Sequence, residues 1–161
     1  MNRFALTLAI IPAFCAAALA GPKWTAASLS ADISARGAAG VATDLARNKG
    51  AGWRAVAAGV ATGGDDWLNI AAALHSEADA SFAEALSFAL AKALQKNPSG
   101  VLTRLGAPAE IEKTCDVPLI EPTDAEVAKW KKASLAALAK VNDPALKDKV
   151  DACLAALAKV N

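Results

Sequence analysis

The chain of 161 residues contains no tyrosine and a single histidine, and no stretch alternates apolar and polar residues with a period of two. β-Branched residues are sparse, so the sequence favours helix over sheet. Any Ser-His-Asp, Cys-His or histidine-dependent zinc site would have to use His75. His75 lies in a polar cluster at an expected helix end, where histidine ordinarily interacts with the helix dipole or with solvent. The scarcity argues against these chemistries.

The chain also lacks an excess of charge of either sign, since 17 Lys and Arg residues are balanced by 16 Asp and Glu residues. The chain therefore has no electrostatic basis for binding nucleic acid or anionic lipid. The glycine-rich stretch 59–64 has no Gly-Lys-Ser/Thr and no preceding strand, which excludes a phosphate loop. We expect a protein that is not an enzyme and uses no metal or cofactor. Converging carboxylates remain open, because sequence alone does not show which acids meet in the fold.

The first twenty residues have the pattern of a secretory signal peptide. Arg3 supplies a positive charge, an uncharged apolar run follows, and Ala18-Leu19-Ala20 is a small-x-small cleavage motif. We expect cleavage between Ala20 and Gly21, and a periplasmic or secreted mature protein in which residues 21–161 form one soluble domain. An uncleaved membrane anchor is the alternative, although the apolar run is short for one. No later apolar run reaches the length needed to cross a bilayer.

Cysteine usage points to a disulfide. Cys15 lies in the expected signal peptide, which leaves Cys115 and Cys153. Two cysteines in an exported protein ordinarily pair, so we predict the bridge Cys115–Cys153. It would close a loop of about forty residues and stabilise the fold by about 4 kcal/mol. Two buried free thiols are the alternative, and the absence of Cys-x-x-Cys argues against a redox site.

Helix start and stop signals divide the rest of the chain into short segments. Capping residues and apolar residues at helical spacing predict helices that begin near Ser28, Trp53, Asp65 or Asp66, Asp79 or Ser81, Pro98, Pro108, Thr123 and Asp143. A break is expected at Arg36-Gly37, and Asn48-Lys49-Gly50 should stop a helix. The proline-containing segment 116–122 should be extended, with its apolar side chains against a helical surface.

The segment 133–142 recurs as 152–161 with a single change, which we interpret as an αα-hairpin. Leu154 is among the residues of its second helix expected to face inward. Together these patterns predict an all-α fold, a compact bundle of six to eight short antiparallel helices with one disulfide.

Two features are candidates for an interaction surface. Trp24 precedes the first helix, and aromatic residues are enriched at recognition surfaces. Its alternative role is to dock the N-terminus on the body of the fold. Lys129, Lys131 and Lys132 surround Trp130 and would suit an anionic partner. They would equally suit the wet side of a helix that buries Trp130.

Several motifs share a pattern with known sequences: Thr62-Gly63-Gly64-Asp65-Asp66-Trp67-Leu68, Asn97-Pro98 and Cys115-Asp116-Val117-Pro118-Leu119-Ile120-Glu121. On these residues the chain resembles small exported helical proteins of Gram-negative bacteria, a group with no assigned activity. The likeness covers roughly residues 53–153. It implies a periplasmic location, a disulfide and an all-helical fold, and it supplies no catalytic residues.

The sequence thus predicts a non-enzymatic periplasmic protein that binds another protein or serves as a structural module. One alternative is an immunity protein that neutralises an antibacterial effector delivered to the periplasm. Another is a small-ligand carrier, or an enzyme with an unrecognised site. A concave pocket with converging carboxylates or His75 would favour this last alternative.

Overall fold

The computed structural model describes residues 24–160, and within this range it contains helices and no strand. The α-helices are α1 (Ala26–Val60), α2 (Asp65–Leu74), α3 (Ala80–Leu94), α4 (Pro98–Arg104), α5 (Pro108–Thr114), α6 (Asp124–Leu138) and α7 (Lys147–Lys159), with 3₁₀ turns η1 (His75–Glu77) and η2 (Pro144–Leu146). The all-α prediction is confirmed. The expected signal peptide and its cleavage site lie outside the described residues.

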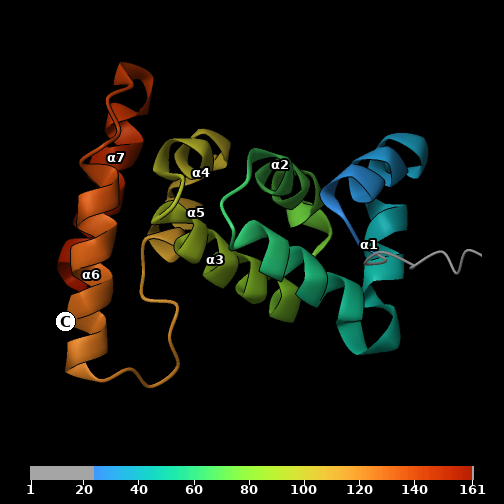
Figure 1. Ribbon diagram of the computed structural model, residues 1–161, viewed down its shortest axis with the longest axis horizontal. Helices are drawn as coiled ribbons and strands as arrows, with labels where there is room; N and C mark the ends of the chain where they lie inside the picture. The colour runs from blue at the N-terminus through green and yellow to red at the C-terminus, as the bar shows by residue number, and fades with distance from the viewer. Residues whose placement is uncertain (1–23, 161) are drawn as a thin grey trace, which may run out of the picture.

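The helices follow one another along an elongated body (Figure 1). α1 lies at one end, where it packs on α2 and α3, and α3 to α5 form the middle. α6 and α7 lie together at the other end, where α7 contacts α5 and α6 contacts the end of α3. In the described residues, no helix has both the length and the apolarity to span a membrane.

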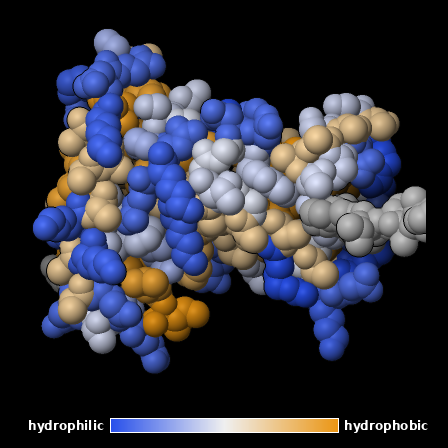
Figure 2. Space-filling view, viewed as in Figure 1, coloured by the Kyte–Doolittle hydropathy of each residue, from blue (hydrophilic) through white to orange (hydrophobic). Residues whose placement is uncertain are grey.

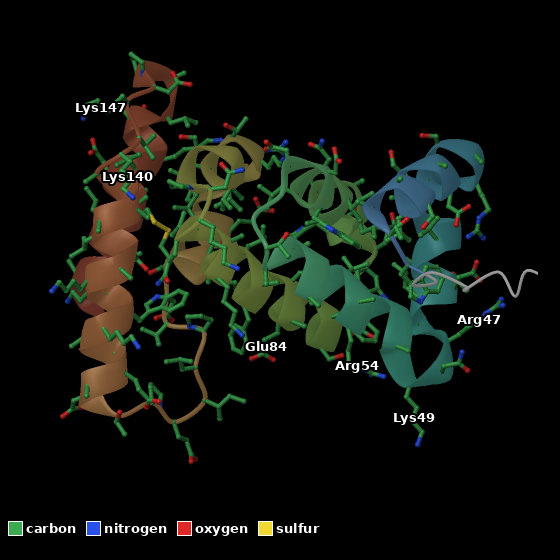
Figure 3. All side chains as sticks on the ribbon, in the orientation of Figure 1. Arg47, Lys49, Arg54, Glu84, Lys140 and Lys147 are labelled. Atoms are coloured by element: carbon green, nitrogen blue, oxygen red, sulfur yellow. A yellow bond between two sulfur atoms is a disulfide. The ribbon has the colours of Figure 1, made fainter. Side chains whose placement is uncertain are left out.

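Two interruptions divide α1, as the sequence predicts. Gly37 has φ 77°, and the run Asn48-Lys49-Gly50 has φ values of 52°, 57° and 71°. This left-handed turn redirects the chain, so that segment 51–60 leaves segment 38–46 at a sharp angle (Figure 1), and Gly52 and Leu45 touch where the two meet. Arg47 and Lys49 extend from the turn into solvent (Figure 3). The change of direction buries Leu45 and Trp53 in the core.

The helix starts show which capping residues the fold uses. Thr123 caps α6 and exchanges hydrogen bonds with Glu126, as predicted. Asp79, rather than Ser81, caps α3: its carboxylate accepts hydrogen bonds from the amides of Ser81 and Phe82. For α2 the expected cap at Asp65 or Asp66 is wrong. Gly64, with extended backbone angles, is the N-cap residue, so Asp65 and Asp66 both lie in the first turn of α2. There their negative charge interacts favourably with the positive end of the helix dipole.

A single apolar core runs through all the helices. It is built mainly from fully buried leucines, at positions 29, 45, 68, 74, 86, 94, 102, 138 and 157. Trp53 stacks on Phe82 with ring centroids 5.2 Å apart, which fixes α1 against α3. In α7 the prediction for Leu154 is wrong: it is exposed, and the smaller Ala156 takes the buried position.

Candidate functional site

Cys115 and Cys153 form a disulfide, as predicted, with their Cα atoms 5.4 Å apart. The bridge joins the residue after α5 to the middle of α7, and both cysteines are buried. It fastens residues 116–160, which we call the C-terminal unit, to the rest of the fold. Reduction would therefore release this unit from α5 before it disturbed the helices around α1 to α3.

Polar contacts add to this attachment. The Gln95 side-chain amide, at the end of α3, donates to Ser134 Oγ of α6 at 3.1 Å. The Lys149 ammonium group of α7 donates to the carbonyls of Leu102 and Leu105, at the end of α4. A cation at a helix C-terminus satisfies carbonyls that lack an intrahelical partner. The C-terminal unit is thus held in one orientation relative to α3, α4 and α5.

The structure separates the residues of the expected interaction surface. Lys131 Nζ donates a hydrogen bond to the carbonyl of Val160, the C-cap residue of α7, at 3.0 Å. This ammonium group therefore caps the C-terminus of α7. Lys129 and Lys132 are exposed, and Lys129 lies near Trp130. Trp24 is partly buried and packs against the core, which favours its docking role. Trp24 also directly precedes α1 and its cap Thr25, at the opposite end of the molecule from α6 (Figure 1).

Exposed large apolar side chains are concentrated in the C-terminal unit. In the described part of the chain they are Leu119, Ile120, Leu135 and Leu154, and all four belong to this unit. Figure 2 shows the strongly hydrophobic surface gathered at the end of the molecule where α6 and α7 lie. Segment 116–122 is not helical, as predicted; Pro118 is buried, and Val117 and Pro122 are partly buried. Leu119 is 37% exposed and lies beside Trp130 of α6, whereas the expectation that Ile120 packs on a helix is wrong, since Ile120 is 86% exposed.

Segment 116–122 is held in a fixed shape. Pro118 is buried and Pro122 lies just before α6, so two prolines with restricted φ frame the exposed residues. Glu121 has φ 48°, a left-handed conformation that costs a non-glycine residue about 1–2 kcal/mol. Surrounding structure must hold this conformation, because local preference opposes it. The backbone on either side of Ile120 is therefore restricted, and the Ile120 side chain projects into solvent.

The same segment is acidic. Between positions 114 and 128 the chain carries four carboxylates and no lysine or arginine, the acids being Asp116, Glu121, Asp124 and Glu126. The Glu126 carboxylate accepts hydrogen bonds from the amide and the hydroxyl of Thr123 at 2.9 and 2.7 Å. These bonds hold the pKa of Glu126 below its ordinary value, so it carries its charge well into the acidic range.

A shallow hollow of about 240 Å³ adjoins this segment. Its lining residues are Gln95, Leu119, Glu126, Lys129, Trp130 and Ala133. The indole N–H of Trp130 is buried and has no hydrogen-bond partner among the described residues. A buried donor without an acceptor destabilises a fold. The unpaired indole N–H of Trp130 therefore offsets part of the stabilisation that its ring contacts provide.

Replacing Trp130 with phenylalanine should therefore change the free energy of unfolding by less than about 1 kcal/mol, since the lost ring area is offset by removal of the unpaired donor. Trp53→Phe is the matched comparison, because Trp53 stacks on Phe82 in the core. That change should lower the free energy of unfolding by about 1–2 kcal/mol. Urea denaturation measures both. Equal losses for the two variants would contradict this assignment.

Groups that could support catalysis or metal binding do not gather at this face. Within residues 24–160 no group of three or more His, Cys, Asp or Glu side chains is placed to hold a metal ion. Comparison with known proteins finds no matching family model, no matching curated protein and no matching solved structure. The resemblance to exported helical proteins stays a prediction. The sequence does not reveal that Leu119 and Ile120 are exposed, because large apolar side chains ordinarily indicate burial.

Proposed function

We propose that the protein is a non-enzymatic module that binds a partner protein through the face formed by segment 117–122 and the first half of α6. The observation that carries the proposal is the exposure of Leu119 and Ile120, which are adjacent on this face. The other large exposed apolar side chains of the described residues, Leu135 and Leu154, lie in the same C-terminal unit but outside the face. Isolated exposed apolar residues are common, but a group of them at one end of a molecule is typical of an interaction site.

The fixed shape of the segment supports this proposal. A residue that is already held in its bound orientation loses little conformational entropy on binding. Ile120 would enter an apolar pocket of the partner, and the hollow beside Trp130 would receive a side chain from it. Aromatic residues at the centre of such contacts contribute much of the binding energy.

The charges indicate the chemistry of the partner. Four carboxylates between Asp116 and Glu126 surround the apolar residues in the sequence, and Lys129 and Lys132 follow on α6. A partner that presents a pocket with a basic rim to segment 116–126 would complement these acids. The charge match would act mainly on the rate of association and on specificity.

An exported location agrees with this function, since disulfides persist in oxidising compartments. The Cys115–Cys153 bridge orients the binding face on the rest of the fold. In the periplasm an immunity role is a special case of the same proposal, in which the partner is an antibacterial effector. The identity of the captured protein distinguishes that role from a structural one.

The test is affinity capture from a periplasmic extract with tagged wild type, Ile120→Asp and Ala39→Asp, followed by mass spectrometry. Ala39 is exposed on α1, at the other end of the molecule, so its substitution adds the same charge away from the face. One partner should be recovered with wild type and with Ala39→Asp, and at least about tenfold less with Ile120→Asp. Equal recovery by all three proteins, or recovery of no partner, would contradict the proposal.

A further inference from the structure

A second and larger hollow lies between α3 and α5, outside the face just described. Its volume is about 460 Å³, within the range of small-molecule sites. Much of its lining is apolar: Ala80, Ala83, Phe88, Leu90, Leu105, Ala109 and Val117. Phe88 is only partly buried, so part of its surface is accessible. The hollow combines an apolar wall with an aromatic ring.

Acidic side chains are part of the lining of this hollow. Glu84 comes from α3, Glu110 from α5 and Asp116 from the segment after α5, and Lys113 is the one lysine in the lining. With His75 neutral, three carboxylates against one ammonium group leave a formal balance of −2. Glu84 is exposed, and its side chain extends outward from α3 (Figure 3). The lining therefore has more negative than positive charge, beside apolar surface.

His75 and Glu110 mark the inner end of the hollow. Glu110 Oε1 lies 3.6 Å from His75 Nδ1. Its other oxygen accepts hydrogen bonds from the amides of Gly106 and Ala107 at 2.8 and 3.1 Å. These amide bonds, aided by electrostatic interaction with the nearby His75 and Lys149, hold the pKa of the Glu110 carboxyl below its ordinary value. Glu110 is thus an ionised residue fixed in place by the start of α5.

A second depression of about 260 Å³ continues beyond this pair. Both hollows are lined by His75, Leu90, Leu105 and Glu110, so they adjoin at this pair. Arg104, which pairs with Asp65, lines the smaller hollow, so the excess of acidic side chains is in the larger one.

The side chains around the hollow are arranged for binding rather than for reaction. The Ser87 hydroxyl donates to the carbonyl of Ala83 at 2.9 Å, one turn back in α3, and no base lies in contact with it. Glu110 is held as a carboxylate by two backbone amides, which makes it a poor proton donor at neutral pH. The hollow is lined by carboxylates and His75, which favours the ligand-carrier alternative.

We infer that this hollow binds an organic cation with an aliphatic stem, of the primary-amine class. The ammonium group lies among Glu84, Glu110 and Asp116, and the stem runs along Phe88 and Leu90. Ion pairing selects the charge, and the apolar wall and a cation–π contact with Phe88 favour an organic cation over a metal ion. Two sources share this chemistry, a free diamine or polyamine and a lysine side chain of another protein.

Calorimetric titration of the protein with cadaverine, an aliphatic diamine, tests the inference. Cadaverine should bind saturably, and pentanoate, which has a similar stem and the opposite charge, should not bind. The variant with Glu84→Gln and Asp116→Asn together should bind cadaverine at least about tenfold more weakly. Glu112→Gln is the matched control, because Glu112 is on α5 but faces Lys159 instead of the hollow, and it should bind normally. Circular dichroism confirms that each variant is folded.

The amide NMR spectrum locates the ligand. Cadaverine should shift the signals of Glu84, Ser87 and Lys113 and leave those of segment 38–46 unchanged. Titration with Nα-acetyl-lysine methylamide distinguishes the sources: tighter binding of this lysine analogue assigns the site to a protein side chain, and tighter binding of cadaverine assigns it to a free amine. Absence of saturable binding by either amine, or equal binding by the doubly substituted protein, would overturn the inference. These readouts do not depend on Ile120 and leave the partner-binding proposal separately testable.

Discussion

Replacing both Cys115 and Cys153 with alanine should lower the free energy of unfolding by about 4 kcal/mol. The bridge spans 38 residues of sequence, and its main effect is to restrict the unfolded chain. Alanine is preferred to serine because both sites are buried, and a hydroxyl group there would need a hydrogen-bond partner. The loss would be a large part of the stability of a domain of this size.

Urea denaturation with and without reductant measures this effect. Reduction of wild type should shift its midpoint to that of the alanine variant, and the variant itself should not respond to reductant. Hydrogen exchange should show faster opening of α6 and α7 in the variant, with α1 to α3 little changed, because the bridge attaches α7 to the end of α5. Identical midpoints for oxidised and reduced wild type would contradict the structural role of the bridge.

The same substitution at two glycines should have opposite effects. A Cβ atom on Gly52 would lie 2.7 Å from the Cα atom of Leu45 and 2.6 Å from its Cδ2. The Leu45 backbone cannot move without separating segments 38–46 and 51–60, so we expect Gly52→Ala to lower the free energy of unfolding by about 2–3 kcal/mol. At Gly40 the nearest atom to a new Cβ is Arg36 Cβ, at 3.7 Å. Gly40→Ala should therefore raise the free energy of unfolding by about 0.5–1 kcal/mol through helix propensity.

Thermal and urea unfolding of the two variants check this pair. Because both add one methyl group to α1, the comparison separates close packing from a general intolerance of substitution. A destabilised Gly40→Ala, or an unaffected Gly52→Ala, would show that the approach of the two segments is looser than the structure indicates.

Local chemistry made the helix boundaries predictable. The reciprocal bonds of Thr123 and Glu126 involve residues three apart, and Asn97-Pro98 stops one helix and starts the next. Such signals act within one turn of helix, so they can be read from sequence. The start of α2 was misplaced because three consecutive residues, Gly64, Asp65 and Asp66, all suit an N-terminus, and the preceding turn decides which is extended.

Contacts between distant segments could not be predicted in the same way. His75 and Glu110 are 35 positions apart, and their approach depends on how α5 packs on α3. Pro118 is buried and Ile120, two positions later, is exposed, and no local sequence signal distinguishes these two apolar residues. Gly52 shows no sequence pattern that distinguishes it from Gly40, and only the turn within α1 brings Leu45 against it.

The two proposed sites share one stretch of chain. Asp116 and Val117 line the α3–α5 hollow, and the exposed residues Leu119 and Ile120 follow directly. A ligand in the hollow would thus contact the residues from which the binding segment begins. The ligand inference and the partner proposal share Asp116 but otherwise rest on different side chains, and each has its own experiment.

Site-specific photocrosslinking tests the central claim most directly. The photoreactive residue p-benzoylphenylalanine is placed at position 120, and in a control protein at position 39, and each protein is irradiated in periplasmic extract. The account predicts one discrete crosslinked species from position 120 and none from position 39. No crosslinked species from position 120, or the same species from both positions, would contradict the assignment of segment 117–122 as the binding face.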